Sequence, residues 1–145
     1  MVRFVEHVVI NRPATEVFTF ISDPENDPPW AAATTIRRTS QGPIGIGTTY
    51  RQTARFMGRD LELAFQVVGY EPNHSIAVTA MSGPLSLEGS RTVDPVGDNA
   101  SRVTASGGGH ARGVLKLAEP LFAAIGARQL RGQLTRLKEL LEAST

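Results

Sequence analysis

The chain has 145 residues, 41% of them hydrophobic, so we expect a single domain over residues 1–145 with one core and no room for a second. Its 15 Lys and Arg against 14 Asp and Glu leave a net charge of +1, which argues against nucleic acid as a partner because no strong field would attract phosphates. The absence of cysteine excludes disulfides, thiol nucleophiles and thiolate metal sites.

The first segment, residues 2–10, mixes apolar and polar positions and stops before Pro13, which predicts a strand. Arg3 and Glu6 interrupt its apolar stretch, so it lacks the basic-then-apolar layout of a signal peptide. No other run approaches the length of a membrane span. We therefore expect a soluble protein that resides in the cytoplasm.

Two short helices are predicted next. Pro13 fits the first turn of a helix, where its missing N–H costs nothing, and apolar side chains follow at helical spacing as far as Ile21. Residues 24–33 are rich in proline and acid but close on Trp30 and three alanines. This composition favours a second short helix or a turn packed under the edge of a sheet.

Residues 34–106 predict an antiparallel meander, because β-rich runs alternate with turn signals. The turn signals are Gly42-Pro43, Gly58-Arg59, Pro72-Asn73, Gly83-Pro84 and Gly97-Asp98-Asn99. With the first segment, the meander brings the expected number of strands to about seven.

Two of these turns indicate which side chains share a face, since opposed residues in a hairpin point the same way. Treating Gly58-Arg59 as a two-residue turn gives one apolar face with the pairs Phe56 and Leu61, Ala54 and Leu63, Gln52 and Phe65, and Tyr50 and Val67. Treating Gly83-Pro84 likewise gives a second apolar face with the pairs Ala80 and Leu87, Val78 and Gly89, and Ile76 and Arg91. Both faces would turn toward the core.

Arg91 is the charged exception on the second face. In that register its guanidinium points to the apolar side, where it needs a partner or water. A buried arginine could anchor a carboxylate, carbonyl or enolate oxygen of a ligand, because its donors form a rigid fork. A turn longer by one residue would instead direct Arg91 to solvent, and the sequence leaves both alternatives open.

Residues 113–145 predict a long helix whose buried face rotates along its length. The first half carries Val114, Ala118, Leu121, Phe122 and Ile125 on one face, and the second half carries Leu130, Leu134, Leu137 and Leu141 on another. Pro120 and Gly126 lie in the first half, so we expect a kink or a late helix start at Pro120.

Four short motifs follow one another along nearly the whole chain. They are Pro13-Ala-Thr-Glu-Val17-Phe18 with Asp23 and Trp30, then Gly45-Ile-Gly47-Thr-Thr-Tyr50, then Tyr70-Glu71-Pro72, and finally Leu134-Thr-Arg-Leu137-Lys138-Glu-Leu-Leu. Together with the order of elements, they resemble the polyketide cyclase/dehydrase and lipid-transport branch of the Bet v 1/START-like (SRPBCC) superfamily. The resemblance implies an α+β helix-grip fold, in which a curved antiparallel sheet of about seven strands wraps round a long C-terminal helix.

The resemblance also implies a deep cavity between sheet and helix for a lipid, sterol, isoprenoid or polyketide-like molecule. Inward apolar side chains are core by default, because core and pocket lining use the same residue types, and only the resemblance makes them candidates for a pocket. Trp30 and Tyr50 stand out because each combines a flat ring with a polar group. The expected ligand-binding residues are Trp30, Tyr50, Phe56, Leu63, Phe65, Val78, Leu87, Arg91, Phe122 and Ile125.

The sequence contains no G-x-S-x-G elbow, P-loop, dinucleotide fingerprint or H-E-x-x-H motif, and its three histidines are far apart, so we expect no metal and no cofactor. His74 fits a solvated turn. His110 stands near the expected mouth of the cavity and is a candidate for proton transfer. Arg91 and Tyr50 are the other candidate catalytic residues. Before His110, Gly107-Gly-Gly predicts a bend between the last strand and the helix, with an anion site at the helix start as the alternative.

Three functions remain open, because the family mixes enzymes, carriers and receptors on one fold. The leading hypothesis is binding or transport of a small hydrophobic molecule without catalysis. The second is a cyclase or dehydratase that uses Arg91, Tyr50 or His110 in the same cavity. The third is a module that binds a protein through a sheet edge or helix. A homodimer is common for such folds, although nothing in the sequence singles out an interface.

Overall fold

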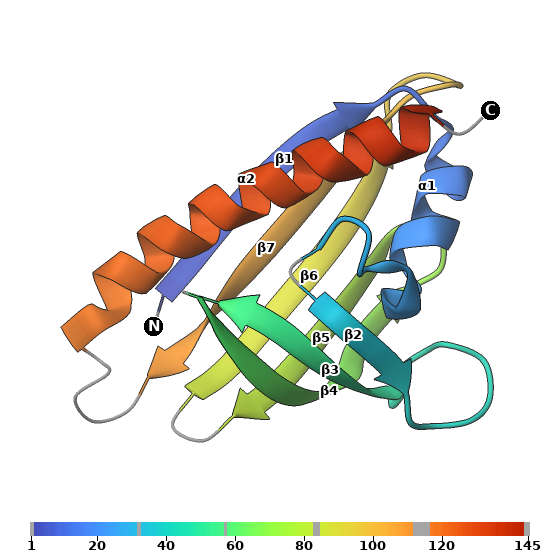
Figure 1. Ribbon diagram of the computed structural model, residues 1–145. Coiled ribbons are helices and arrows are strands. Elements are labelled where there is room, and N and C mark those ends of the chain that lie inside the picture. The colour runs from blue at the N-terminus through green and yellow to red at the C-terminus, as the bar shows by residue number, and fades with distance from the viewer. Residues whose placement is uncertain (1, 32, 57, 83–84, 112–116, 144–145) are drawn as a thin grey trace.

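Seven antiparallel strands form one curved sheet, and a long helix packs against it in the computed structural model (Figure 1). The structure describes residues 2–31, 33–56, 58–82, 85–111 and 117–143. The elements are β1 (Val2–Ile10), α1 (Ala14–Ile21), the 3-10 turn η1 (Pro24–Asn26), β2 (Ala33–Arg38), β3 (Thr49–Phe56), β4 (Arg59–Glu71), β5 (Ser75–Ser82), β6 (Leu85–Pro95), β7 (Ser101–Ala111) and α2 (Glu119–Ala143).

The strand order is β1-β7-β6-β5-β4-β3-β2, so each strand from β2 to β6 pairs with the next one along the chain and β1 closes onto β7. Side chains along β1 alternate between exposed and partly buried, as a strand with one solvated face requires. α2 lies across β1 and β7, while α1 covers the ends of β6 and β7 (Figure 1). This is the α+β helix-grip architecture.

The interior contains two clusters of buried apolar side chains. The larger joins α1, the second half of α2 and the ends of β1, β6 and β7, and its buried members include Val17, Phe18, Ile21, Trp30, Val93, Val103, Leu134, Leu137 and Leu141. The smaller consists of Tyr50, Phe65, Val67 and Ile76 on β3, β4 and β5. The second half of α2 therefore buries the leucine face that its sequence predicts.

The predicted register is confirmed in one hairpin and wrong in the other. Ile76 lies opposite Arg91 on β5 and β6, as predicted. On β3 and β4, Tyr50 lies opposite Phe65 rather than Val67, because the chain turns one residue earlier than the Gly58-Arg59 pair suggested. A shift of two residues in pairing keeps every side chain on its face, so the predicted apolar face survives the error.

Only one of the two short helices predicted after the first strand is an α-helix. The second is reduced to η1, where the Asp23 side chain accepts a hydrogen bond from the Glu25 backbone N–H at 3.0 Å. Pro28 and Pro29 follow at once, and a proline cannot donate the backbone hydrogen bond that would extend a helix. The prolines therefore confine this segment to turns.

The final helix starts late, as the position of Pro120 predicts. A single 3-10 turn at residues 117–118 precedes α2, which begins at Glu119, and residues 112–116 lie outside the described residues. The apolar face predicted for the first half of this helix is not buried throughout, because Leu121 is 54% exposed. Val114 and the side chain of Phe122 lie outside the described part of the chain.

The glycine triplet does not form a bend. Residues 107–109 lie inside β7 and pair with β1, and α2 begins only at Glu119, so the alternative of an anion site at the helix start is also wrong. A Cβ atom at these positions would collide with the ring of Phe4, the backbone of Val2 and the backbone of Ser86. The close approach of neighbouring strands and of one aromatic ring explains the glycines.

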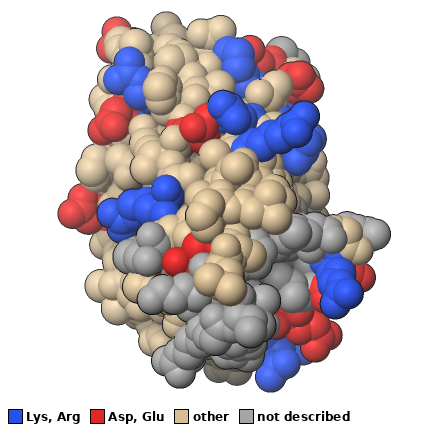
Figure 2. All heavy atoms as spheres, turned by 90° about the vertical axis from the view of Figure 1, so that its left-hand side faces the viewer, with Lys and Arg blue, Asp and Glu red and all other residues tan. Residues whose placement is uncertain are grey.

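Charged side chains of both signs are interspersed with neutral ones on the face that Figure 2 shows, which agrees with the nearly balanced total charge. Of the helices that the structure describes, none is both long and apolar enough to cross a bilayer.

Candidate ligand-binding site

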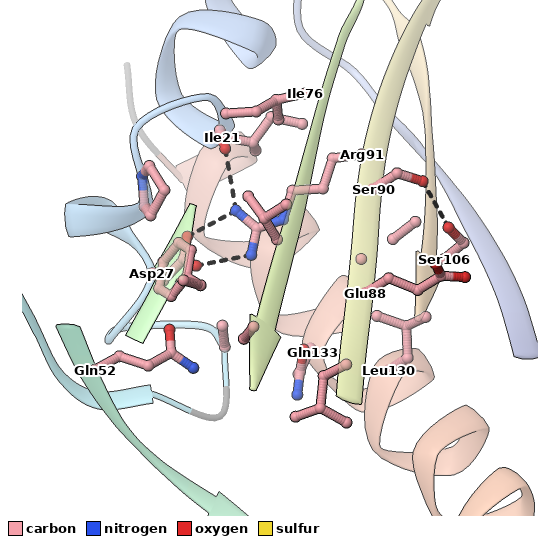
Figure 3. A pocket seen from close by; sticks show the side chains of 18 of the residues that line it. Ile21, Asp27, Gln52, Ile76, Glu88, Ser90, Arg91, Ser106, Leu130 and Gln133 are labelled. Atoms are coloured by element: carbon pink, nitrogen blue, oxygen red, sulfur yellow. Dashed lines mark hydrogen bonds and ion pairs between the residues drawn. The ribbon is translucent and has the colours of Figure 1, made fainter. Parts of the chain in front are cut away.

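A cavity of about 280 Å³ lies between the inner face of the sheet, α2 and the segment around η1 (Figure 3). Residues of the α1–η1 region, of strands β3 to β7 and of α2 meet around it, and its walls are mostly apolar. It is lined by Ile21, Pro24, Asp27, Ala31, Gln52, Leu63, Phe65, Ile76, Val78, Ala80, Leu87, Glu88, Gly89, Ser90, Arg91, Ala105, Ser106, Leu130 and Gln133.

The cavity exists partly because β6 carries no side chain at Gly89. This residue lies opposite Val78 on β5, where the neighbouring pairs direct side chains into the cavity. A Cβ atom at Gly89 would make only ordinary contacts, at 3.5 Å to the Ser106 carbonyl oxygen and 3.8 Å to Val78 Cγ2. A larger residue there would extend into the open volume, so glycine keeps the space empty.

Arg91 and Asp27 form the central polar group of the wall (Figure 3). Arg91 Nη1 and Nη2 donate to the two carboxylate oxygens of Asp27, each at 2.8 Å, and Nη1 also donates to the Ile21 carbonyl oxygen at 3.0 Å. The Asp27 side chain is 8% exposed and that of Arg91 is 21% exposed. This is a two-pronged ion pair held largely away from water.

The local fold positions each partner independently. Arg91 faces inward because β6 alternates and its partner Ile76 is buried. Asp27 follows η1, and its carbonyl oxygen accepts hydrogen bonds from the backbone N–H groups of Trp30 at 2.9 Å and Ala31 at 2.7 Å. A turn in a proline-rich segment therefore brings a carboxylate to the end of a strand pair more than 60 residues away along the chain.

Two opposing effects act on the Asp27 carboxyl group. Burial raises its pKa because it disfavours the charged form, while the Arg91 guanidinium lowers it, and burial is the larger effect. The pKa of Asp27 is thus above the usual range of an aspartate. A titratable group with a raised pKa on the wall of a cavity has the chemical character of a functional residue.

Trp30 forms the layer behind the ion pair. Its ring is 1% exposed, and the Arg91 guanidinium carbon lies 4.5 Å from the ring centroid, so the cation stacks over the aromatic face. The indole Nε1–H is buried without a hydrogen-bond partner among the described residues. Trp30 thus fixes the guanidinium from one side while Asp27 holds its edge.

Tyr50 is buried next to the cavity wall. Its ring stacks on Phe65 with centroids 5.0 Å apart, and only 1% of the residue is exposed. Burial raises the pKa of Tyr50 to about 12, and its hydroxyl has no hydrogen-bond partner in the described part of the chain. An unpartnered buried hydroxyl is unfavourable unless water or a ligand satisfies it.

The remaining polar groups of the lining are neutral or paired. Gln52 and Gln133 contribute side-chain amides from β3 and α2 (Figure 3). Ser90 and Ser106 share a hydrogen bond of 2.5 Å. Glu88 accepts from Arg3 at 3.2 Å at the outer edge.

Comparisons with known proteins place this geometry in a family. The sequence profile described as "Polyketide cyclase / dehydrase and lipid transport" matches residues 1–142. The chain belongs to this family. A comparison with curated proteins found no significant sequence match.

Several solved structures share the fold of this polyketide cyclase/dehydrase and lipid transport family member. A START superfamily protein from Mycobacterium smegmatis superposes with a TM-score of 0.86 at 14% identity, covering 99% of both chains. The Zhui aromatase/cyclase from Streptomyces sp. R1128 gives 0.83 at 12% identity, covering 97% of this chain and 93% of that one. A norcoclaurine synthase point mutant from Thalictrum flavum gives 0.72 at 18% identity, covering 99% and 96%. At these identities the likeness shows the fold alone.

The structure brings half of the expected ligand-binding residues of this family member to the cavity wall. These are Leu63, Phe65, Val78, Leu87 and Arg91. Trp30 and Tyr50 lie one layer behind the wall, and Ile125 on α2 is outside the lining. The side chains of Phe56 and Phe122 lie outside the described residues. Their roles in binding stay predictions.

The two alternatives for Arg91 are decided by geometry. The side chain points into the cavity, and the solvent-facing alternative is wrong because the β5–β6 turn adds no extra residue to the register. It is not a free anchor, however, since Asp27 already occupies two of its donors.

The histidines stand apart from the cavity. His110 is exposed near the end of β7, and no atom of it belongs to the described lining. His74 occupies the β4–β5 turn, as predicted, where Nδ1 lies 2.8 Å from Glu71 Oε2 and Nε2 lies 3.3 Å from Asp94 Oδ1. The hydrogen bond to Glu71 raises the pKa of His74. Within the described ranges, no three His, Asp or Glu side chains gather as metal ligands would.

Asp27 is the main residue that sequence reasoning missed. It lies in a stretch with two other acidic residues and three prolines, where no periodicity indicates which side chain turns inward. The one available signal was Arg91, whose inward register required a partner. Gln52 was placed on the apolar face but not taken as a lining residue, and Leu130 and Gln133 were hidden by the rotation of the helix face.

Proposed function

We propose that the chain binds and carries a small hydrophobic molecule in the cavity between the sheet and α2. The observation that carries this proposal is an apolar cavity of about 280 Å³ with one desolvated polar group, the Asp27–Arg91 pair, on its wall. Binding sites for small molecules typically combine apolar walls with a few placed polar groups. Membership of a family described by lipid transport and polyketide cyclisation supports the same class of ligand.

The apolar wall would supply most of the affinity. Removing apolar surface from water contributes roughly 25 cal/mol per Å², so a ligand that buries about 300 Å² gains about 7 kcal/mol before the cost of immobilisation. The polar groups would orient the ligand, since they are fixed by the ion pair, by stacking on Trp30 and by the strand register. Affinity and orientation would thus come from different residues.

Native mass spectrometry with a library of apolar compounds tests the proposal. The library contains fatty acids, sterols, isoprenoids and aromatic polyketides, and the protein is also analysed as purified and after acid denaturation. We expect a complex of one ligand per chain with at least one class, which disappears on denaturation. If no class gives a specific complex at ligand concentrations up to the solubility limit, the proposal is wrong.

A second candidate function is a cyclase or dehydratase, and the buried Asp27 carboxyl group favours it. Dehydration removes a proton from a carbon beside a carbonyl and expels the neighbouring hydroxyl as water. A carboxyl group with a raised pKa can carry that proton between the two positions. Arg91 would stabilise the enolate oxygen through its remaining N–H groups.

Turnover separates the two functions. A linear poly-β-ketone analogue is incubated with the wild type and with Asp27→Asn, and products are identified by liquid chromatography and mass spectrometry. Loss of product in the variant with retained ligand binding supports the enzyme. A wild type that binds the analogue and returns it unchanged supports the carrier.

A further inference from the structure

The charges on the cavity wall are already neutralised in pairs. Arg91 is the only Lys or Arg among the described lining residues, and both oxygens of Asp27 occupy it at 2.8 Å. The other lining carboxylate, Glu88, is paired with Arg3 at 3.2 Å. The described part of the wall therefore offers no unpaired positive charge to a ligand.

This pairing acts against ionic ligands of either sign. A carboxylate or phosphate entering the cavity would lose its hydration and meet Asp27, a negative group that is itself buried. An ammonium group would likewise meet the Arg91 guanidinium, which lies beside the buried Asp27 carboxylate. Burying an ion without a free counter-charge is strongly unfavourable, so the site selects against ions.

The same cluster still offers hydrogen bonds to a neutral group. A guanidinium has five N–H donors, and the contacts to Asp27 and Ile21 use three of those on Arg91. The Nε–H and one Nη2–H have no acceptor among the described residues. Gln52 and Gln133 add neutral amides elsewhere on the wall, as Figure 3 shows. Carbonyl and hydroxyl oxygens can accept from these groups without carrying charge.

The volume limits the size of the ligand. A cavity of about 280 Å³ is near the lower end of ligand-binding cavities, which span roughly 300 to 1,000 Å³. A molecule of one or two rings fits within the described cavity, whereas a sterol or a long acyl chain would extend out of it.

Building on the proposed binding function, we infer that the ligand is an uncharged molecule of one or two rings. A ketone or hydroxyl group of this ligand faces the Arg91–Asp27 pair. The site discriminates against carboxylates of the same size, so fatty acids and aromatic acids are poor ligands. Asp27 is the residue that sets this selectivity, because it cancels the charge of Arg91.

A matched pair of probes tests this inference by isothermal titration calorimetry. 2-Acetylnaphthalene and 2-naphthoate have the same ring system and the same number of non-hydrogen atoms, but only the second is charged at pH 7. We expect the wild type to bind the ketone at least about tenfold more tightly, a difference of about 1.4 kcal/mol. Equal or tighter binding of the naphthoate would overturn the inference and leave the proposed function standing.

The variant Asp27→Asn tests the assigned cause. It keeps the size and shape of the side chain but leaves the Arg91 charge uncompensated, so the affinity ratio should shift by at least about tenfold toward the naphthoate. Asp60→Asn is the matched control, because Asp60 is exposed on β4 away from the cavity, and it should leave the ratio unchanged. Circular dichroism establishes that each variant is folded.

The possible outcomes distinguish the proposed binding function from the inferred class of ligand. An unchanged ratio in folded Asp27→Asn overturns the role of Asp27, and if that variant does not fold, the wild-type ratio decides the inference alone. A charged or larger library ligand that binds while neither probe does would overturn the inference only. Failure of both probes, together with an empty library screen, would overturn the proposed function and the inference with it.

Discussion

Arg91 and Asp27 depend on each other for their burial. Each is a charge that the interior would exclude alone, and the two-pronged hydrogen bonding compensates both. Trp30 and the Ile21 carbonyl group complete the surroundings of the guanidinium. The pair is thus a structural element of the wall as well as a candidate for contact with a ligand.

Removal of one member should therefore cost more than removal of both. Arg91→Met leaves the Asp27 carboxyl group buried without its cation and should lower the free energy of unfolding by about 2 to 3 kcal/mol. The double variant Asp27→Leu/Arg91→Met buries apolar groups of similar size and should recover most of that loss. Urea unfolding followed by circular dichroism measures both. A double variant no more stable than Arg91→Met would show that the pair is not coupled.

Tyr50 presents the opposite case, a buried polar atom without a partner. Tyr50→Phe removes the hydroxyl and keeps the stacking on Phe65, so we expect the free energy of unfolding to rise by about 1 kcal/mol. A decrease would mean that the hydroxyl is satisfied, by water for example. The measurement is urea unfolding at pH 7.

The titration of the Tyr50 phenol provides an independent test of its burial. The folded chain keeps the phenol protonated up to a pKa of about 12, whereas the unfolded chain releases the proton near 10. Ionisation of Tyr50 therefore leaves the free energy of unfolding unchanged below pH 10 and lowers it as the pH rises toward 12. The difference in absorbance at the phenolate band between the wild type and Tyr50→Phe isolates this titration from that of Tyr70.

At the level of elements, one aromatic ring joins the strand edge to the helix. Phe4 on β1 lies opposite Gly107 on β7, and Gly126 on α2 approaches the same ring from the other side. A side chain at either glycine would meet the ring. The two glycines therefore set how closely the first half of α2 approaches the sheet.

Gly107→Ala should disturb this contact. The new Cβ would stand 2.6 Å from Phe4 Cε2, and Gly126 blocks the ring from moving away, so we expect a loss of about 1 to 3 kcal/mol in the free energy of unfolding. Phe4→Leu in the same chain shortens the opposing side chain and should recover part of the loss. Thermal unfolding of the single and double variants measures this. Equal losses in both would exclude the ring as the cause.

The sequence predicts elements better than it predicts distances between them. Alternation and turn residues are local, so they indicated the facing of β3 to β6 and, with Arg91, a charge that needed a partner. The β3–β4 register was wrong by two residues because alternation cannot detect an even shift. The glycines of β7 and the inward turn of Asp27 depend on contacts with distant segments, which no local pattern encodes.

At the scale of the whole molecule, the two clusters of buried side chains meet at Tyr70, which packs against both, and each contributes side chains to the cavity wall. The larger cluster fixes α1 and the second half of α2 to the sheet. The smaller one lies under β3, β4 and β5. The cavity wall includes members of both clusters, among them Ile21, Phe65 and Ile76. Gly89 contributes no side chain to that wall, so a substitution there alters the cavity without removing a core side chain.

Filling the cavity at Gly89 tests two things together: whether the open volume is needed for packing, and whether the ligand binds there. Gly89→Leu directs an apolar side chain into the open volume, and its Cβ makes only ordinary contacts. We expect the free energy of unfolding to rise by about 1 to 2 kcal/mol, because apolar surface is buried and a glycine is removed from a strand. Ligand affinity should fall at least about tenfold, which corresponds to about 1.4 kcal/mol.

Ala64→Leu is the control for this substitution, since Ala64 is exposed on the outer face of β4 and lies outside the cavity wall. Calorimetry with 2-acetylnaphthalene and urea unfolding compare the two variants with the wild type. If Gly89→Leu is folded and binds the ketone as tightly as the wild type does, the ligand lies elsewhere. If it loses stability as well as affinity, the volume beside Gly89 is needed for packing and the two roles of the interior are not separable.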